Sequence, residues 1–99
     1  MTDVGAGGVV IERWSKSKRF HKDYDKLTID LRDLVDGKLQ DLAKNPRPPG
    51  LRFEKLNGYS KPSIYTIHVT GNYKASMEIE SSHAYLRRVG THDEIDRAP

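Results

Sequence analysis

Hydrophobic residues in the first half of the chain recur every three or four positions, and this spacing predicts helices. Before them, Val9–Trp14 is a short β-branched run that predicts a strand. Ser15 is the expected N-cap of the first helix, in which Phe20, Tyr24 and Leu27 follow at i, i+4 and i+7. Those three side chains would form one apolar stripe facing the core.

The same spacing continues into a second helix, for which Thr28 is the expected N-cap. Gly37 lies inside it and should cost about 1 kcal/mol relative to alanine. The two segments predict a helical hairpin or one bent helix. Asn45–Gly50 carries three prolines, which end the helix and form a stiff connector. The apolar positions of the second helix are Leu31, Leu34 or Val35, Leu39 and Leu42.

The second half of the chain alternates between apolar and polar residues, which predicts β-strands. Leu51–Leu56 alternates ahead of a turn signal at Asn57-Gly58 and leads into the sheet, and Gly71-Asn72 is the expected turn of a hairpin. The predicted strands of that sheet are Ile64–Val69, Tyr73–Glu80 and Ala84–Gly90.

Alternation also assigns faces to these strands. In the strand Tyr73–Glu80, the inward set is Tyr73, Ala75, Met77 and Ile79, and the outward set is Lys74, Ser76, Glu78 and Glu80. For the last strand the pattern leaves open whether Tyr85 and Val89 or Ala84 and Leu86 face inward. The resulting fold class is α+β in the order β-α-α-β-β-β, with two helices packed on one face of a small curled antiparallel sheet and the other face open.

The length and composition agree with a single small domain. The 99 residues predict a flexible leader at 1–8 and one domain at 9–99, and the hydrophobic fraction of 35% allows only a thin core. The chain has no cysteine, which favours a reducing cytoplasm. No apolar run reaches the roughly 18 residues of a membrane span, and the first eight residues lack the profile of a signal peptide.

Positive charge concentrates in the middle of the chain. Between Lys44 and Lys74 there are six basic residues and one acid, Glu54, which gives a net charge of +5 over 31 residues. Glu12–Ala43, in contrast, has eight basic and seven acidic residues. Such a field attracts polyanions, although a solvated lysine-rich surface would have the same composition. The basic side chains expected to contact a nucleic acid are Arg52, Lys55, Lys61, Arg87 and Arg88.

The outward face of the sheet carries residues suited to phosphodiester chemistry. His68 and Lys74 should project from adjacent strands, and His92 follows the last strand. RNA cleavage without a metal needs a base for the 2′-hydroxyl, cations for the transition state and an acid for the leaving 5′-oxygen. Histidine suits the first and last roles because its pKa of about 6.5 lies near neutral pH.

Three other kinds of site find no support in the sequence. The four histidines do not have a metal-binding spacing, and Gly5–Gly8 precedes a strand without the Lys-Ser/Thr of a phosphate loop. No serine lies in a nucleophile elbow. We therefore expect neither a metal nor another cofactor.

In the order and spacing of its motifs, the chain resembles the RelE/ParE superfamily of bacterial toxins from toxin–antitoxin pairs. The resemblance covers about residues 9–97, and the end of the chain is similar to YafQ-like members. The segments that carry it are Leu39–Pro46, Glu54–Gly58, Ile64–Val69, Gly71–Ala75 and Val89–Arg97.

This resemblance implies an endoribonuclease that cuts mRNA in the ribosomal A site and is restrained by a cognate antitoxin. Lys74 matches a strand arginine that contacts the scissile phosphate, and His68 matches a basic residue on the preceding strand. His92 matches a proposed acid, and Glu54 falls near a carboxylate used as a base in some members.

Two residues depart from the family pattern. Lys74 keeps the charge of the usual arginine but loses its bidentate fork, and Asp96 stands where many members have tyrosine. Related proteins without nuclease residues act on DNA gyrase. The sequence therefore leaves two alternatives beside the nuclease: a non-enzymatic gyrase-binding toxin, and a catalytically weakened member that mainly binds antitoxin or RNA.

Overall fold

The computed structural model describes residues 10–44, 47–48, 50–60 and 62–99. It contains three helices and one five-stranded sheet, with an element order of β-α-α-β-β-β-β-α. The α+β class is as predicted. The leader, Val9, part of the proline-rich connector and Lys61 lie outside the described residues. The elements are β1 (Arg13–Lys16), α1 (Lys18–Asp25), α2 (Ile29–Leu42), β2 (Glu54–Ser60), β3 (Ser63–His68), β4 (Tyr73–Glu80), β5 (His83–Thr91) and α3 (His92–Arg97).

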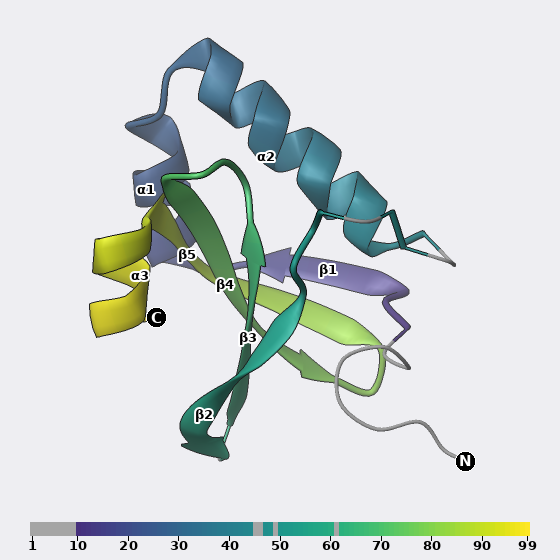
Figure 1. Ribbon diagram of the computed structural model, residues 1–99. Coiled ribbons are helices and arrows are strands. Elements are labelled where there is room, and N and C mark those ends of the chain that lie inside the picture. The colour runs from purple at the N-terminus through teal and green to yellow at the C-terminus, as the bar shows by residue number, and fades with distance from the viewer. Residues whose placement is uncertain (1–9, 45–46, 49, 61) are drawn as a thin grey trace.

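The sheet is mixed rather than purely antiparallel, with the strand order β1-β5-β4-β3-β2. The run from β2 to β5 is antiparallel, but β1 pairs in parallel with β5, from Arg13 opposite His83 to Lys16 opposite Leu86. Parallel pairing is possible because the whole segment from α1 to β4 separates the two strands, which is more than the length that a parallel connection requires. The strands turn strongly across the sheet, so that β1 and β5 run steeply across the direction of β2 and β3 (Figure 1).

The first strand and the first cap lie later in the chain than the sequence predicts. β1 begins at Arg13 and includes Ser15, whose hydroxyl lies 2.6 Å from the His83 ring across the strand pair. The N-cap of α1 is Ser17 instead, and its hydroxyl accepts a hydrogen bond from the backbone N–H of Phe20. Thr28 caps α2 as predicted, and α2 runs through Gly37 without a break.

The predicted turn at Asn57-Gly58 is wrong. These residues lie inside β2, where the pairing with β3 shifts between Lys55 and Ser60. Gly58 has a φ of +84°, which glycine adopts without a Cβ clash, so it accommodates an irregular strand rather than a hairpin turn. Leu51–Leu56 therefore leads into a full edge strand of the sheet. The turn at Gly71-Asn72 between β3 and β4 is as predicted.

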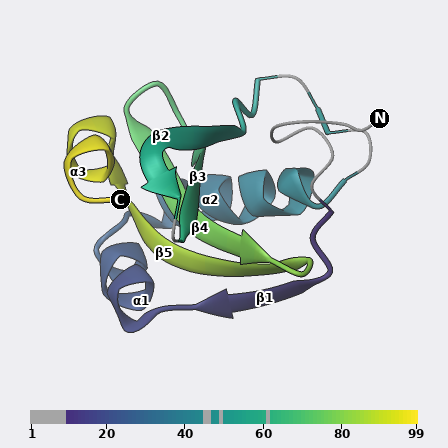
Figure 2. The same cartoon turned by 90° about the horizontal axis from the view of Figure 1, so that it is seen from below.

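The main core lies between the helical hairpin and one face of the sheet (Figures 1 and 2). Phe20, Val35 and Leu42 from the helices are at most 1% exposed. From the sheet, the same cluster includes Ile67, Val69, Ala75, Met77, Ala84, Leu86 and Val89. The alternation in β3 and β4 thus predicted this face correctly.

A bulge resolves which residues of β5 face inward. Met77 pairs with Leu86 whereas Ser76 pairs with Arg88, so Arg87 is an extra residue on β5. The alternation changes phase there, and Ala84, Leu86 and Val89 are all buried. Neither of the two registers left open by the sequence holds along the whole strand, because each assumes unbroken alternation.

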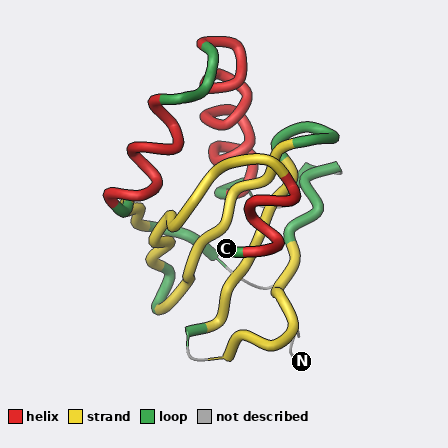
Figure 3. The backbone as a smooth tube through the Cα atoms, turned by 90° about the vertical axis from the view of Figure 1, so that its left-hand side faces the viewer, coloured by secondary structure: helices red, strands yellow, loops and turns green. Residues whose placement is uncertain are grey.

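The second face of the sheet is not open as predicted. Thr66 and Ser76 are 0% exposed there and Lys74 is 9% exposed, although all three are polar. α3 packs against β4 and β5, and its Ile95 is completely buried. Figure 3 shows this short helix apart from the helical hairpin. The sequence missed α3 as a helix, and with it the cover over this face.

Candidate functional site

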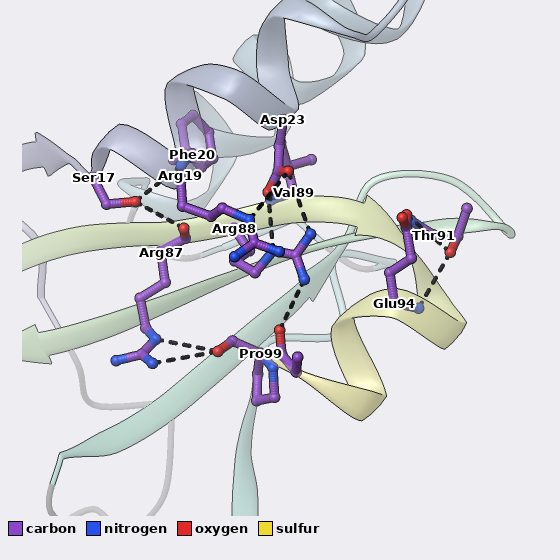
Figure 4. Close-up of polar contacts among 11 residues, drawn as sticks. Ser17, Arg19, Phe20, Asp23, Arg87, Arg88, Val89, Thr91, Glu94 and Pro99 are labelled. Carbon is purple, nitrogen blue, oxygen red and sulfur yellow. Dashed lines mark hydrogen bonds and ion pairs between the residues drawn. The ribbon is translucent and has the colours of Figure 1, made fainter.

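The end of β5, which leads into the site, is held in place by α1. Beyond Lys16, β1 no longer pairs with β5, and α1 takes over this edge. The Asp23 carboxylate accepts a hydrogen bond from the backbone N–H of Val89 at 3.2 Å and pairs with the Arg88 guanidinium at 3.1 Å. Figure 4 shows Asp23 pointing from α1 onto the strand. The buried Asp23 carboxylate therefore accepts a hydrogen bond from a backbone N–H on a strand edge, where no neighbouring strand supplies an acceptor.

α3 starts from a capping box directly after this anchored segment. The Thr91 hydroxyl accepts from the backbone N–H of Glu94, and the Glu94 carboxylate accepts from the backbone N–H of Thr91 (Figure 4). The hydrogen bonds that the Glu94 carboxylate accepts from the backbone N–H and the hydroxyl of Thr91 lower the pKa of Glu94. A Cβ on Gly90 would lie 2.7 Å from Glu94 Oε1, so glycine leaves the room that the capping box needs.

The capping box places His92 against His68. His92 is the first residue of α3, and its backbone N–H donates to the carbonyl of Asn72 at 2.9 Å, in the turn between β3 and β4. The two imidazole rings meet edge to face, with centroids 4.5 Å apart and planes at 79°. Nε2 of His92 is buried and has no hydrogen-bond partner among the described residues. The sequence predicted that these two histidines lie in the same region, and in the structure their rings are in contact.

Lys74 lies beside the two histidines on β4. It is the cross-strand partner of His68 on one side and of Gly90 on the other. Its side chain is 11% exposed, and its ammonium group donates to the carboxylate of Asp96 at 2.7 Å. Asp96 lies one turn after His92 on α3 and its side chain is 55% exposed. The cation expected at this site is therefore present and ion-paired.

Arg52 and Glu54 complete the cluster from the segment that enters β2. Glu54 pairs with Thr66 across β2 and β3, which places it on the same face as His68. The backbone N–H of His68 donates to the carbonyl of Leu51, next to Arg52. Arg52 has a φ of +52°, a left-handed conformation that is strained for a residue with a Cβ. The structure thus brings Arg52, Glu54, His68, Lys74 and His92 to one region.

An open depression of about 640 Å³ borders three residues of this cluster. It is lined by Arg52, His68 and His92 together with Lys38 of α2 and residues 69–71. A second depression, of about 480 Å³, adjoins it at Gly71 and His92. The first depression, with Lys38 and Arg52 in its lining, is therefore concave and cationic, which suits an extended polyanion better than a small enclosed ligand.

The pKa of His68 is lowered from its usual value. Partial burial is the largest cause, followed by the nearby His92, Lys74 and Arg52, whereas Glu54 acts in the opposite direction. The neutral form of His68 is therefore favoured over its protonated form relative to a histidine in solvent. A neutral imidazole beside fixed cations can accept a proton, which is the role of a general base.

Three other basic residues expected to bind RNA, Lys55, Arg87 and Arg88, lie elsewhere, and Lys61 is outside the described residues. Lys55 pairs with Tyr65 and so faces the opposite side of the sheet from Glu54. Arg87 pairs with Glu78 and donates to the carbonyl of Pro99, and Arg88 pairs with Asp23. Both arginines line a separate depression that does not include either histidine of the pair. Their charges are thus used within the fold, so the nucleic-acid contacts assigned to them remain a prediction.

Two residues of the site were not assigned to it from the sequence. Lys38 lies on α2, where nothing in the helical pattern distinguishes it from other polar positions. Asp96 was noted only as a departure from a family pattern, and its contact with Lys74 spans 22 residues. Among the described residues, no group of three or more histidine, aspartate or glutamate side chains could hold a metal ion. Within the same residues, no helix is both long and apolar enough to cross a membrane.

Comparison with known proteins supports this arrangement at the level of the fold. The sequence matches no protein-family model and has no significant match among curated proteins. Solved structures do match. In the RelB–RelE antitoxin–toxin complex from Methanococcus jannaschii, the match is 25% identical over 86% of this chain and 99% of that chain, with a TM-score of 0.62.

Two further toxin–antitoxin structures show the same similarity. In the Escherichia coli DinJ–YafQ complex, the match is 19% identical over 86% of this chain and 98% of that chain, with a TM-score of 0.70. In the RelE–RelB complex from Pyrococcus horikoshii, it is 15% identical over 83% of this chain and 96% of that chain, with a TM-score of 0.65. The protein therefore has the fold of the RelE and YafQ toxins, which confirms the resemblance seen in the sequence.

Proposed function

We propose that this protein is the toxin of a toxin–antitoxin pair and that it is a metal-independent endoribonuclease. The observation that carries the proposal is the edge-to-face contact of His68 and His92 beside Lys74, on a concave cationic surface. Two imidazoles and a lysine are the groups that cleavage of RNA through its 2′-hydroxyl requires. The fold shared with RelE and YafQ toxins supports the same function.

In this mechanism His68 acts as the base and His92 as the acid. His68 takes the proton from the 2′-hydroxyl, since its lowered pKa favours the neutral imidazole that can accept it. The 2′-oxygen then attacks the phosphorus, and Lys74 and Arg52 stabilise the negative charge that develops. His92 gives a proton to the departing 5′-oxygen, which leaves a 2′,3′-cyclic phosphate. Glu54 lies on the same face and favours the protonated state of His68 after the first transfer.

We further propose that the substrate is mRNA, bound at the ribosomal A site, and that a cognate antitoxin restrains the protein. An apolar groove between β1 and α2, of about 400 Å³, offers one surface for such a partner. Trp14 and Leu39 line it, and Trp14 is 37% exposed despite its size. An amphipathic helix or strand laid along the helical hairpin and the sheet edge would cover these side chains.

The nuclease is tested by comparing the wild type with His68→Gln and His92→Gln on a purified message, with and without ribosomes. Each variant should lose at least about 100-fold in cleavage rate, because each removes one proton-transfer group. His21→Gln is a matched control, since His21 is exposed on α1. Full cleavage by either site variant would remove that histidine from the mechanism.

Two outcomes point to the alternatives. Growth arrest with intact transcripts and a DNA-damage response would indicate a toxin that acts on gyrase. Antitoxin binding without either effect would indicate a catalytically weakened protein. The ion pair between Lys74 and Asp96 is the feature that favours weakened cleavage, because it places a carboxylate on the cation that lies opposite His68 across β3 and β4.

A further inference from the structure

Asp96 occupies a position in the site that the proposed mechanism does not explain. Its carboxylate contacts the Lys74 ammonium at 2.7 Å, and it lies on the same helix as His92, four residues later. A carboxylate next to a phosphate-binding group opposes the approach of RNA. Its presence therefore requires a role other than binding the substrate directly.

The two partners of this ion pair differ in how firmly they are held. The Lys74 side chain is 11% exposed and lies on a central strand between two cross-strand neighbours, so its position is fixed by the sheet. The Asp96 side chain is 55% exposed and lies on the second turn of a six-residue helix. An ion pair with one largely exposed partner is weak and screened by salt. Asp96 can consequently leave Lys74 without disturbing the sheet.

The surroundings of Lys74 are otherwise suited to an anion. The cations and imidazoles that converge on this region are those of Lys74, Arg52, His68 and His92, and Nε2 of His92 is buried without a partner among the described residues. The acids near the cluster include Asp96, Glu54 and Asp93, the last of which lines the adjoining depression with His92. Of these three, Asp96 makes the direct contact with the lysine.

We propose that Asp96 holds the place of a phosphate group on Lys74, so that a phosphodiester must displace its carboxylate to bind. This inference rests on the proposed function, and it deepens it by naming a restraint that the chain imposes on its own site. Asp96 then lowers the affinity of the site for RNA, because its carboxylate competes with phosphate for Lys74. When a phosphate bridges Lys74 and the histidine pair, it replaces the Asp96 carboxylate as the anion bound to the Lys74 ammonium.

The variant Asp96→Asn tests this exchange, because it removes the charge and keeps the size of the side chain. Asp93→Asn is the matched control: it lies on the same helix, is 88% exposed and pairs with Arg97 rather than Lys74. Binding is measured by fluorescence anisotropy on a single-stranded oligoribonucleotide whose 2′-hydroxyls are methylated and therefore cannot attack. Measurements run over a series of salt concentrations.

We expect Asp96→Asn to bind at least about three-fold more tightly than Asp93→Asn, which has the same net charge. The plot of log affinity against log salt should steepen by about 0.7, the contribution of one additional contact to a single-strand phosphate. In a Lys74→Ala background, Asp96→Asn should gain nothing over Asp93→Asn. Equal affinity and slope for the two Asn variants, or weaker binding by Asp96→Asn, would overturn the proposal and make Asp96 a residue that positions Lys74.

A second measurement keeps this inference separable from the nuclease function. Inorganic phosphate is titrated into each protein while the ring signals of His68 and His92 are followed by NMR. Asp96→Asn should bind phosphate more tightly than both the wild type and Asp93→Asn. Tighter phosphate binding without any RNA cleavage would refute the nuclease and leave the inference standing. RNA cleavage by the wild type with unchanged phosphate and RNA binding in Asp96→Asn would refute the inference alone.

Discussion

Replacing Asp23 with alanine should destabilise the protein more than any substitution of an exposed carboxylate. Asp23 is 7% exposed, and its carboxylate is bonded to the Arg88 guanidinium and to the backbone N–H of Val89. The alanine variant leaves both donors without this partner on the edge of β5 that β1 does not reach. Figure 4 shows that the three groups converge from α1 and β5.

The magnitude follows from these contacts. A buried backbone donor left unsatisfied costs about 1–3 kcal/mol, and breaking a buried ion pair costs about 3–5 kcal/mol. Arg88 retains a hydrogen bond to the carbonyl of Ala98, which offsets part of the second loss. We therefore expect a loss of roughly 3 kcal/mol in the free energy of unfolding, and a fall in Tm of roughly 15 °C for a domain of this size.

Urea denaturation monitored by circular dichroism measures this loss, with Asp33→Ala as the control. Asp33 is exposed on α2, so its removal should change stability by less than about 0.5 kcal/mol. Hydrogen exchange at the amide of Val89 should also accelerate in the Asp23 variant. A loss below about 1 kcal/mol would show that Asp23 does not close the edge of β5, and the account of how α1 anchors this strand would then be incorrect.

Three further predictions concern the site and the core. Gly90→Ala should push the Glu94 carboxylate away from a Cβ placed 2.7 Å from it, so that the capping box is lost at a cost of about 1 kcal/mol; NMR should show α3 fraying, and an intact α3 would contradict the packing argument. Because the pKa of folded His68 is lowered, its contribution to stability is complete above its usual pKa and is lost as pH falls through the folded value. Urea unfolding from pH 7.5 to pH 5 should show that decline, and a His68→Gln variant with the same decline would assign it to other groups. Leu42→Ala empties a completely buried position and should cost about 2–5 kcal/mol in the same assay, whereas a loss under about 1 kcal/mol would place Leu42 outside the core.

The sequence predicted the parts of the fold that depend on local periodicity. The apolar stripes that include Phe20 in α1 and Leu42 in α2 identified the two helices. The alternation of Ala75 and Met77 identified the strand β4 and the face that the helices cover. Parallel pairing of β1 with β5 was not predictable in this way, because it depends on contacts between residues such as Arg13 and His83, which are 70 positions apart.

The candidate site was predicted in part for the same reason. His68 and Lys74 are cross-strand partners because a short turn sets their register, and alternation is enough to place them on one face. α3 escaped notice because six residues are too few for a helical period, and its capping box at Thr91 and Glu94 was the one local signal of it. Without that helix, neither the cover over Lys74 nor the contact with Asp96 could be inferred.

The parallel pairing of β1 with β5 also has a consequence for the order in which the chain folds. Strands β3 and β4 and strands β4 and β5 are joined by short turns, so their contacts form at little cost in loop-closure entropy. β1 pairs with a strand about seventy residues later in the chain, so its docking closes a long loop. This long loop closure makes the docking of β1 the slow last step of folding. Folding should therefore begin in the hairpins that carry His68 and Lys74, and the N-terminal strand should dock last.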